Sequence, residues 1–255
     1  MRLVDLGRRV RLGLVMVMLA GCGMVAPPPA TQRPAPDPVP MPVAPVAAQN
    51  PGRMPPELAV QTFVDVVRRV EPVAEAFCRE SAPQRNCDFL IRVDDRPGQP
   101  INAFQSRDDT GRPIITFTAA LILDARSADE LAFVLGHEAA HHIAGHLDRQ
   151  RDTALAGALI AGALAAAVGG NDPRAIRTAQ EMGAAVGART YSKDFELEAD
   201  AGGTIIAWRA GFDPERGAGF FARLPDPGNR FLGTHPPNEA RIFTVRRTLD
   251  RLRAR

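Results

Sequence analysis

The apolar residues between positions 127 and 143 recur every three to four residues, the spacing of one face of an α-helix. That face is formed by Leu131, Val134, Leu135, Ala139 and Ile143. Ser127-Ala-Asp-Glu130 precedes it in the form of a capping box. In such a box the Ser127 hydroxyl accepts from the Glu130 N–H, while the Glu130 carboxylate returns to the Ser127 N–H. The pattern predicts a helix that starts at Ser127.

A second helix is predicted from Phe195 to Trp208, because the segment that follows is a helix stop. Ala210-Gly-Phe-Asp-Pro214 offers a glycine for the position after the last turn and a proline shortly beyond it. On this helix Glu196 and Asp200 lie one turn apart on one face. Glu198 points about 200° away from Glu196, where we expect it to be solvated or paired with an arginine.

Residues 1–21 have the organisation of a lipoprotein signal peptide: basic residues through Arg11, then a short apolar run, then Gly21-Cys22. The apolar run is too short for a stable membrane anchor and fits a signal-peptide core. Leu19-Ala-Gly-Cys22 resembles the bacterial lipobox, in which the cysteine becomes the lipidated first residue. Gly23 follows it, and there the resemblance implies an outer-membrane destination, facing the periplasm, rather than inner-membrane retention. The alternative is an uncleaved signal anchor with an incidental cysteine.

A proline-rich tether is predicted to follow over residues 22–56, since twelve of the 23 prolines lie between Pro27 and Pro56. No apolar periodicity interrupts it, so it cannot bury a core and should be extended and semi-rigid. At roughly 3.1 Å per residue, its 34 residues after Cys22 reach at most about 100 Å. We therefore expect the folded domain to occupy residues 57–255.

Charge and cysteine content fit an exported protein that does not bind nucleic acid. The chain has formal net charge +2, of which four arginines and one aspartate in the first 21 residues contribute +3, so the remainder carries −1. With Cys22 lipidated, Cys78 and Cys87 form an even pair in an oxidising compartment, which predicts a structural disulfide. The rival is a metal site, but this pair lacks a neighbouring histidine.

The candidate chemistry begins with His137-Glu138-Ala-Ala-His141 on the first predicted helix. Two histidines at i and i+4 can reach one metal ion, and Glu138 lies beside them as a candidate general base. A histidine as third ligand is disfavoured because Ala144 and Leu147 occupy the expected positions. A downstream carboxylate is then the candidate third ligand: Glu196 and Asp200 lie one turn apart on one face, so that one could bind the ion while the other hydrogen-bonds a ligand imidazole.

Other histidines have simpler interpretations. His142 and His146 form a second pair one turn apart, rotated about 100° from the first and without a carboxylate between them. We expect both to pack in the core or to support the ligands. Taken singly, His137 and His141 would also be acceptable core histidines, and only their combination with Glu138, Glu196 and Asp200 favours a metal centre.

These motifs resemble peptidase family M48, the gluzincin metallopeptidases, over most of residues 57–255. The matching segments are Asn102–Phe104 with Ile114–Phe117, Gly136–His141 with His146, Glu196–Asp200, Ala210–Pro214, and Thr234–Pro236 with Arg241. The resemblance is to exported lipoprotein-type members. It implies a zinc ion bound by His137, His141 and Glu196, and hydrolysis of peptide bonds with Glu138 as catalytic base.

The resemblance also implies the fold: α+β and zincin-like, mainly helical, with a small antiparallel sheet bordering the active-site cleft. Asn102 and Arg241 are candidate substrate-binding residues, although Arg241 could instead pair with Glu239 or Asp200. His235 is a candidate catalytic residue that could donate to the oxyanion, occupy the open zinc position, or cap a turn. The apolar segment 153–168 is expected to be a buried or cleft-covering helix, with a membrane-contacting lid as the rival.

The sequence therefore predicts a zinc endopeptidase that hydrolyses unfolded or misassembled cell-envelope proteins and binds them by strand addition. Its partners would be polypeptide substrates and, through the lipid anchor, a membrane. Two alternatives remain. One is a periplasmic chaperone or assembly factor that binds client strands in the same cleft with proteolysis latent. The other is a purely structural zinc site with a closed coordination sphere.

Overall fold

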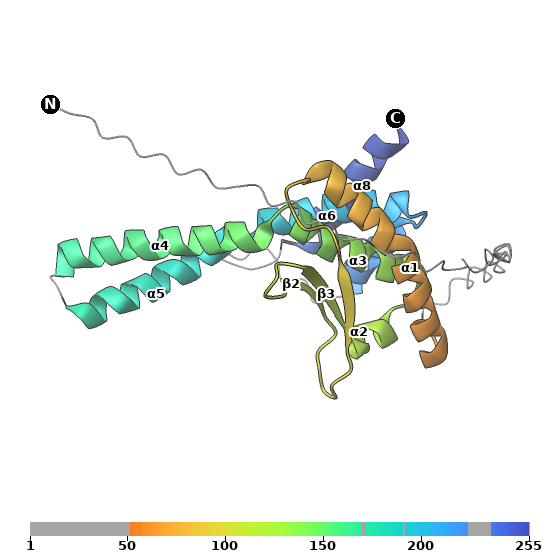
Figure 1. The fold of residues 1–255 in the computed structure, drawn as a ribbon, viewed down its shortest axis with the longest axis horizontal. Helices are drawn as coiled ribbons and strands as arrows, with labels where there is room; N and C mark the ends of the chain where they lie inside the picture. The colour runs from red at the N-terminus through yellow and green to blue at the C-terminus, as the bar shows by residue number, and fades with distance from the viewer. Residues whose placement is uncertain (1–51, 170–171, 191, 224–235, 255) are drawn as a thin grey trace, which may run out of the picture. The chain divides into compact units, whose positions relative to one another are not determined.

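The computed structural model describes residues 52–169, 172–190, 192–223 and 236–254 (Figure 1). The signal peptide, Cys22, nearly all of the tether, and His235 lie outside the described residues. The elements, in chain order, are α1 (Pro56–Ser81), β1 (Leu90–Asp94), β2 (Ala103–Arg107), β3 (Pro113–Thr118), α2 (Ala119–Asp124), α3 (Ala128–Ile143), α4 (His146–Gly169), α5 (Pro173–Thr190), α6 (Ser192–Arg209), α7 (Pro214–Arg223) and α8 (Asn238–Arg253).

The main core forms around α3, which is buried along almost its whole length. Helix α1 covers it with one apolar face, whose buried members recur every three or four residues: Ala59, Phe63, Val66, Val70, Ala74 and Cys78. Phe63 of that face packs against Phe117 of β3, with ring centroids 5.0 Å apart. Helices α6 and α7 also pack on α3, and α8 packs on both of these.

The fold class is confirmed as α+β and mainly helical, with a small sheet whose β2–β3 pair is antiparallel as expected; the addition of β1 as a parallel strand makes the sheet mixed. The strand order is β1-β3-β2, with β1 parallel and β2 antiparallel to the central β3. After β1 the chain passes to the far edge to form β2, then turns back into the middle position. Asp108 makes this turn by accepting from the N–H groups of Thr110 and Arg112, and Gly111 adopts φ +83°. Residues 108–112 therefore form a hairpin turn between β2 and β3.

Helix α3 begins after Ser127 as predicted, and α6 begins at Ser192, three residues before the predicted Phe195. The cap of α3 differs in one respect. Ser127 accepts from the Glu130 N–H at 3.3 Å, as expected. The Glu130 carboxylate, however, accepts from the Arg126 N–H at 2.9 Å and forms an ion pair with Arg223 of α7. The distant arginine draws the carboxylate away from the Ser127 N–H, and this links the start of α3 to α7.

Helix α6 ends in the glycine motif that the sequence suggests. Gly211 has φ +80°, its N–H donates to the Trp208 carbonyl, and the Phe212 N–H donates to the Ala207 carbonyl. Together these bonds form a Schellman motif, which satisfies the last carbonyls of the helix.

Helices α4 and α5 pack along each other as an antiparallel pair (Figure 1). The expectation that segment 153–168 is buried was wrong. Leu159 is 61% exposed and Ile160 70% exposed. The helix contacts its partner through glycine and alanine and leaves its large apolar side chains outside, so its apolar composition does not contribute to the core.

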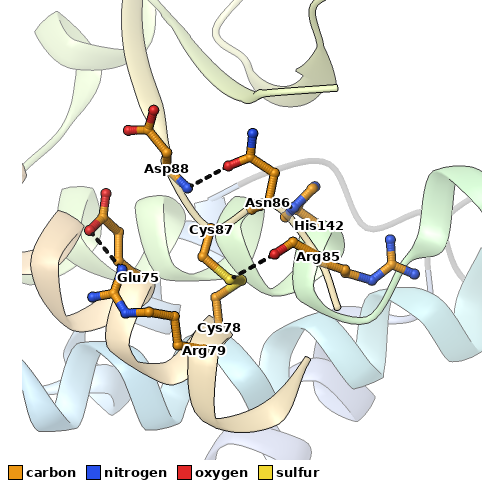
Figure 2. Close-up of a disulfide and its surroundings, with 8 residues drawn as sticks. All are labelled: Glu75, Cys78, Arg79, Arg85, Asn86, Cys87, Asp88 and His142. Carbon is orange, nitrogen blue, oxygen red and sulfur yellow. Dashed lines mark hydrogen bonds and ion pairs between the residues drawn. A yellow bond between two sulfur atoms is a disulfide. The ribbon is translucent and has the colours of Figure 1, made fainter. Parts of the chain in front are cut away.

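A disulfide joins Cys78, in the last turn of α1, to Cys87, in the loop before β1, with the two Cα atoms 5.7 Å apart (Figure 2). The loop so held contacts the ligand-bearing helix, because His142 of α3 donates its Nε2–H to the Asn86 carbonyl at 2.8 Å. His142 is buried and takes a packing role. The bridge thereby fixes the loop that supports α3 on the side of His142.

Candidate metal centre

Helices α3 and α6 bring His137, His141 and Glu196 together, with one donor atom of each within 4.8 Å of the others. Two glycines permit this close approach. A Cβ on Gly203 would lie only 2.8 Å from the His137 backbone nitrogen, and one on Gly136 would lie 3.0 Å from the Gly203 carbonyl oxygen. The helices thus touch backbone to backbone beside the ligands. Larger residues at either position would force the donor atoms apart.

The spacing of the three donors fits a tetrahedral ion. The Nε2 atoms of His137 and His141 lie 3.0 Å apart, and the Glu196 carboxylate oxygens lie 3.7 and 3.4 Å from them. Ligand bonds of about 2.0–2.1 Å at tetrahedral angles require donors about 3.3 Å apart. Two imidazoles and one carboxylate are also the donor set that zinc uses in open, catalytic sites. The residues present therefore fit zinc.

His137 is oriented by Asp200, whose Oδ1 lies 3.0 Å from the imidazole Nδ1. Asp200 is fully buried, and Arg241 of α8 binds it with two hydrogen bonds of 2.8 and 2.7 Å. Burial raises the pKa of Asp200, but the hydrogen bonds from Arg241 and His137 outweigh it and leave the pKa lowered. An ionised Asp200 accepts from Nδ1–H and leaves Nε2 free for a metal. The structure thus places Arg241 on Asp200, one of the two carboxylates considered from sequence.

His141 is oriented by a longer chain of contacts. Its Nδ1 lies 2.8 Å from Nδ1 of His146, whose Nε2 lies 3.1 Å from the Glu198 carboxylate. Glu198 also pairs with Arg149 at 2.6 Å, the arginine partner expected from its position on the helix. The carboxylate accepts from His146 Nε2–H, so that His146 Nδ1 can accept from His141 Nδ1–H. The Nε2 atom of His141 then faces the metal position.

Glu138 is 9% exposed and lies between the two ligand histidines in sequence. Desolvation by burial raises its pKa, although the nearby His137 and His141 act in the opposite direction. A carboxylate with a raised pKa is a better proton acceptor than an ordinary surface glutamate. This side chain can therefore take a proton from a water molecule at the metal position.

A small pocket lies between α3 and the edge strand β2, lined in part by His141, Gln105 and Arg107. Gln105 Oε1 is buried there and, among the described residues, has no hydrogen-bond partner. Arg107 and Arg85 both bind Asp148, which belongs to the first turn of α4. The edge of β2 thus borders the candidate site.

Sequence reasoning placed the ligand set together but missed this polar cluster. Nothing in the spacing of Arg85, Arg107 and Asp148 predicts their contact, since they come from a loop, a strand and a helix. Asn102 lies just before β2, exposed, and its carbonyl accepts from the Thr118 N–H. His235 lies outside the described residues.

Comparison with known proteins agrees with this geometry. Residues 61–249 match the family described as peptidase family M48, which is more than half of the chain. The chain belongs to peptidase family M48. It is also 34% identical over 148 residues to a putative beta-barrel assembly-enhancing protease of Vibrio cholerae serotype O1. That match covers 52% of this chain and 30% of the relative, so the chain spans well under half of the relative's length.

The resemblance drawn from the motifs is thus confirmed at the level of the family. This M48 domain is a metallopeptidase of the hydrolase class. The histidine pair, Glu196 and Glu138 all lie inside the matched range, as do β2 and the α4–α5 pair.

Proposed function

We propose that this M48 domain is a zinc-dependent endopeptidase that hydrolyses unfolded or misassembled cell-envelope proteins. The observation that carries the proposal is the convergence of His137, His141 and Glu196 from two helices, with the buried Glu138 beside them. The ligand side chains of His141 and Glu196 remain 14% and 13% exposed, so the site is not sealed. A purely structural site would require a closed sphere of four protein ligands.

Each residue has a separate task in the proposed reaction. Zinc, when bound, supplies a Lewis acid that polarises the scissile carbonyl and lowers the pKa of water. Glu138 takes the proton of the attacking water and delivers it to the leaving amine. Asp200 and His146 hold the ligand imidazoles in the tautomer that presents Nε2. His235 is proposed to donate to the developing oxyanion.

Recognition of extended polypeptide is proposed to use the free edge of β2. Among the described residues, this strand pairs with β3 and no other strand. A substrate segment that pairs with its outer edge would be held by backbone hydrogen bonds near His141, largely independently of sequence. Asn102, the exposed residue just before this strand, is proposed to contact such a segment. Only an unfolded or unassembled protein offers a free strand of this kind.

The envelope location rests on the sequence and on the relative. The signal peptide of residues 1–21, lipidation of Cys22 and the proline-rich tether are proposed to hold the domain at the outer membrane, facing the periplasm. The Vibrio cholerae relative is described by its name as a protease that enhances β-barrel assembly. Proteins awaiting assembly in the outer membrane are therefore the substrate class that we propose.

The test combines metal analysis with cleavage of an unfolded protein. Glu138→Gln should retain one zinc ion per chain and the wild-type fold, while cleavage falls by about 10²–10⁴-fold, because the proton acceptor is lost. Glu181→Gln, an exposed change on α5, serves as the matched control and should cleave normally. Wild-type protein that binds zinc but cleaves no unfolded substrate would refute the endopeptidase assignment. Full biological rescue by Glu138→Gln would favour the chaperone alternative.

A further inference from the structure

Seven of the large apolar side chains that are exposed among the described residues lie together on the α4–α5 pair, outside the metal centre. Its members on α4 recur at helical spacing: Leu155 (61% exposed), Leu159 (61%), Ile160 (70%), Leu164 (63%) and Val168 (82%). On α5, Met182 is 66% and Val186 48% exposed. From Ala154 to Gly169 helix α4 contains no polar or charged side chain. Monomeric proteins rarely leave so continuous an apolar surface in water.

The packing between the two helices is the inverse of that in a water-soluble helical hairpin. Soluble pairs bury leucines between the helices and expose polar residues. Here the contact is made by glycines: a Cβ on Gly157 would overlap the Gly183 carbonyl oxygen, and one on Gly187 would overlap the Thr153 carbonyl oxygen. Small residues inside and large apolar residues outside are the arrangement of helix pairs surrounded by lipid, where close backbone contact replaces the hydrophobic effect.

We propose that the α4–α5 pair is a membrane-docking hairpin, which inserts the exposed apolar side of α4 into the surface of a phospholipid bilayer. By overall length and mean hydropathy, helix α4 is the one described helix that is similar to a membrane-crossing segment, and only 6% of this apolar stretch is buried. This proposal rests on the packing and exposure of the hairpin and does not depend on zinc or on cleavage.

The hairpin lies in the interface and does not span the bilayer. The apolar part of α4 is about 24 Å long at 1.5 Å per residue, shorter than the roughly 30 Å hydrocarbon layer. Helix α5 carries Arg174, Arg177 and Glu181 along its exposed surface, which spanning would place in hydrocarbon. An interfacial helix instead buries one side by about 5–10 Å and keeps its charges at the headgroups.

Charge on the hairpin is complementary to lipid phosphate. Arg151, Arg174, Arg177 and Arg189 are all exposed and distributed over both ends of the pair. Their long side chains can lie along apolar surface and reach phosphate oxygens, an arrangement typical of helices bound at an interface. Asp152 and Glu181 offset part of this charge, so we expect apolar burial to dominate and anionic lipid to add to it.

Docking would place the catalytic cleft close to the membrane surface. The hairpin begins at His146, which contacts the ligand His141, and its last helix leads directly to α6, which carries Glu196. The metal centre therefore lies at the base of the hairpin. A bilayer that binds the hairpin would hold the site beside proteins that are being inserted into the membrane.

The first experiment is vesicle flotation of the full chain with Cys22→Ser, so that no acyl group contributes. Vesicles are of phosphatidylcholine, alone or with about 30% phosphatidylglycerol. In the test variant, serine also replaces four apolar residues of α4: Leu155, Leu159, Ile160 and Leu164. In the control variant, serine instead replaces four apolar residues that are exposed outside the hairpin: Val60, Val64, Val93 and Phe243. The test variant should partition roughly 100-fold more weakly than the control, because four apolar side chains no longer enter lipid.

A second measurement reports on the hairpin itself, whatever the N-terminal segment does. In a Trp208→Phe background, which removes the only native tryptophan, tryptophan is introduced at Leu159 or, as the control, at Phe243. Vesicles should shift the emission of Leu159→Trp to shorter wavelength, and brominated lipids should quench it, while Phe243→Trp stays unchanged. Equal behaviour of the two probes would overturn the proposal. The proposal would also be overturned if the serine variant lost self-association but still bound vesicles. The exposed apolar side of α4 would then contact a second copy of the chain and not lipid.

Discussion

Replacement of Asp200 by asparagine tests the central electrostatic interaction of the fold. Asp200 is fully buried and Arg241 is 5% exposed, and two hydrogen bonds join them. Asparagine keeps the shape of the side chain but removes the charge. Arg241 is always protonated and would lose its doubly hydrogen-bonded partner. It would keep only the Glu196 carboxylate, 3.5 Å from its Nη2, and the Phe221 ring, whose centroid lies 3.3 Å from the guanidinium carbon.

The expected cost is large because one partner of a buried ion pair is lost. Such changes typically destabilise a protein by about 3–5 kcal/mol. In a domain of about 200 residues this corresponds to a fall of about 10 °C in melting temperature. The measurement is urea denaturation of the metal-free protein at pH 7.5, so that no metal-binding energy enters the comparison.

A double-mutant cycle separates the two tasks of Asp200. Arg241→Met removes the cation and fills similar space, so Asp200→Asn combined with Arg241→Met should recover most of the lost stability. Zinc affinity should not recover, because His137 still lacks its carboxylate partner, and a 10–100-fold loss is expected in both variants. A cost below about 1 kcal/mol for Asp200→Asn, or strictly additive stabilities in the cycle, would refute this reasoning.

Three further predictions concern the helix contact, the disulfide and pH. Gly203→Ala should destabilise the fold by about 1–3 kcal/mol and weaken zinc binding, because the new Cβ would press on the His137 backbone. Denaturation measures the stability and calorimetric titration the zinc affinity. An unchanged zinc affinity would contradict this prediction. Cys78→Ser with Cys87→Ser should cost about 2–3 kcal/mol in urea denaturation, a loss that reductant should reproduce in the wild type. Burial lowers the pKa of His146 to about 4, from about 6.5 in the unfolded chain. As pH falls, the unfolded chain therefore binds a proton at this imidazole at higher pH than the folded protein does. Stability of the metal-free protein should then fall as pH drops from about 6.5 to about 4, and His146→Gln should reduce that slope.

The sequence predicts well those features that depend on local periodicity. The start of α3 at Ser127, the shared face of His137 and His141, and the glycine stop at Gly211 all follow from spacing within one helix. The meeting of Glu196 with the histidines required more, since Glu196 lies 55 positions after His141; spacing offered Glu196 and Asp200 as candidate ligands, and the family resemblance selected Glu196.

The errors and omissions concern contacts between distant segments. The direction of β1 relative to β3 depends on the path of the connecting chain, which composition does not encode. Glu130 was assigned to its local partner, but Arg223 from α7 changed its orientation. Apolar composition of segment 153–168 indicated burial, whereas its glycine spacing turned the leucines outward. Hydrophobicity measures the cost of contact with water and does not specify which neighbour removes that contact.

Because α4 leads away from the metal centre and α5 returns to it, the number of residues between His141 and Glu196 does not determine the geometry of the metal ligands. His141 and Glu196 are far apart in sequence, yet the chain leaves the metal centre at His146 and returns at the start of α6. Near this point the Gln150 side chain already meets the Ala188 carbonyl, so the two arms are joined at the base. Whole turns could therefore be removed from or added to both arms together without displacing a single ligand. Helices α4 and α5 could therefore be shorter or longer while the catalytic centre stays the same.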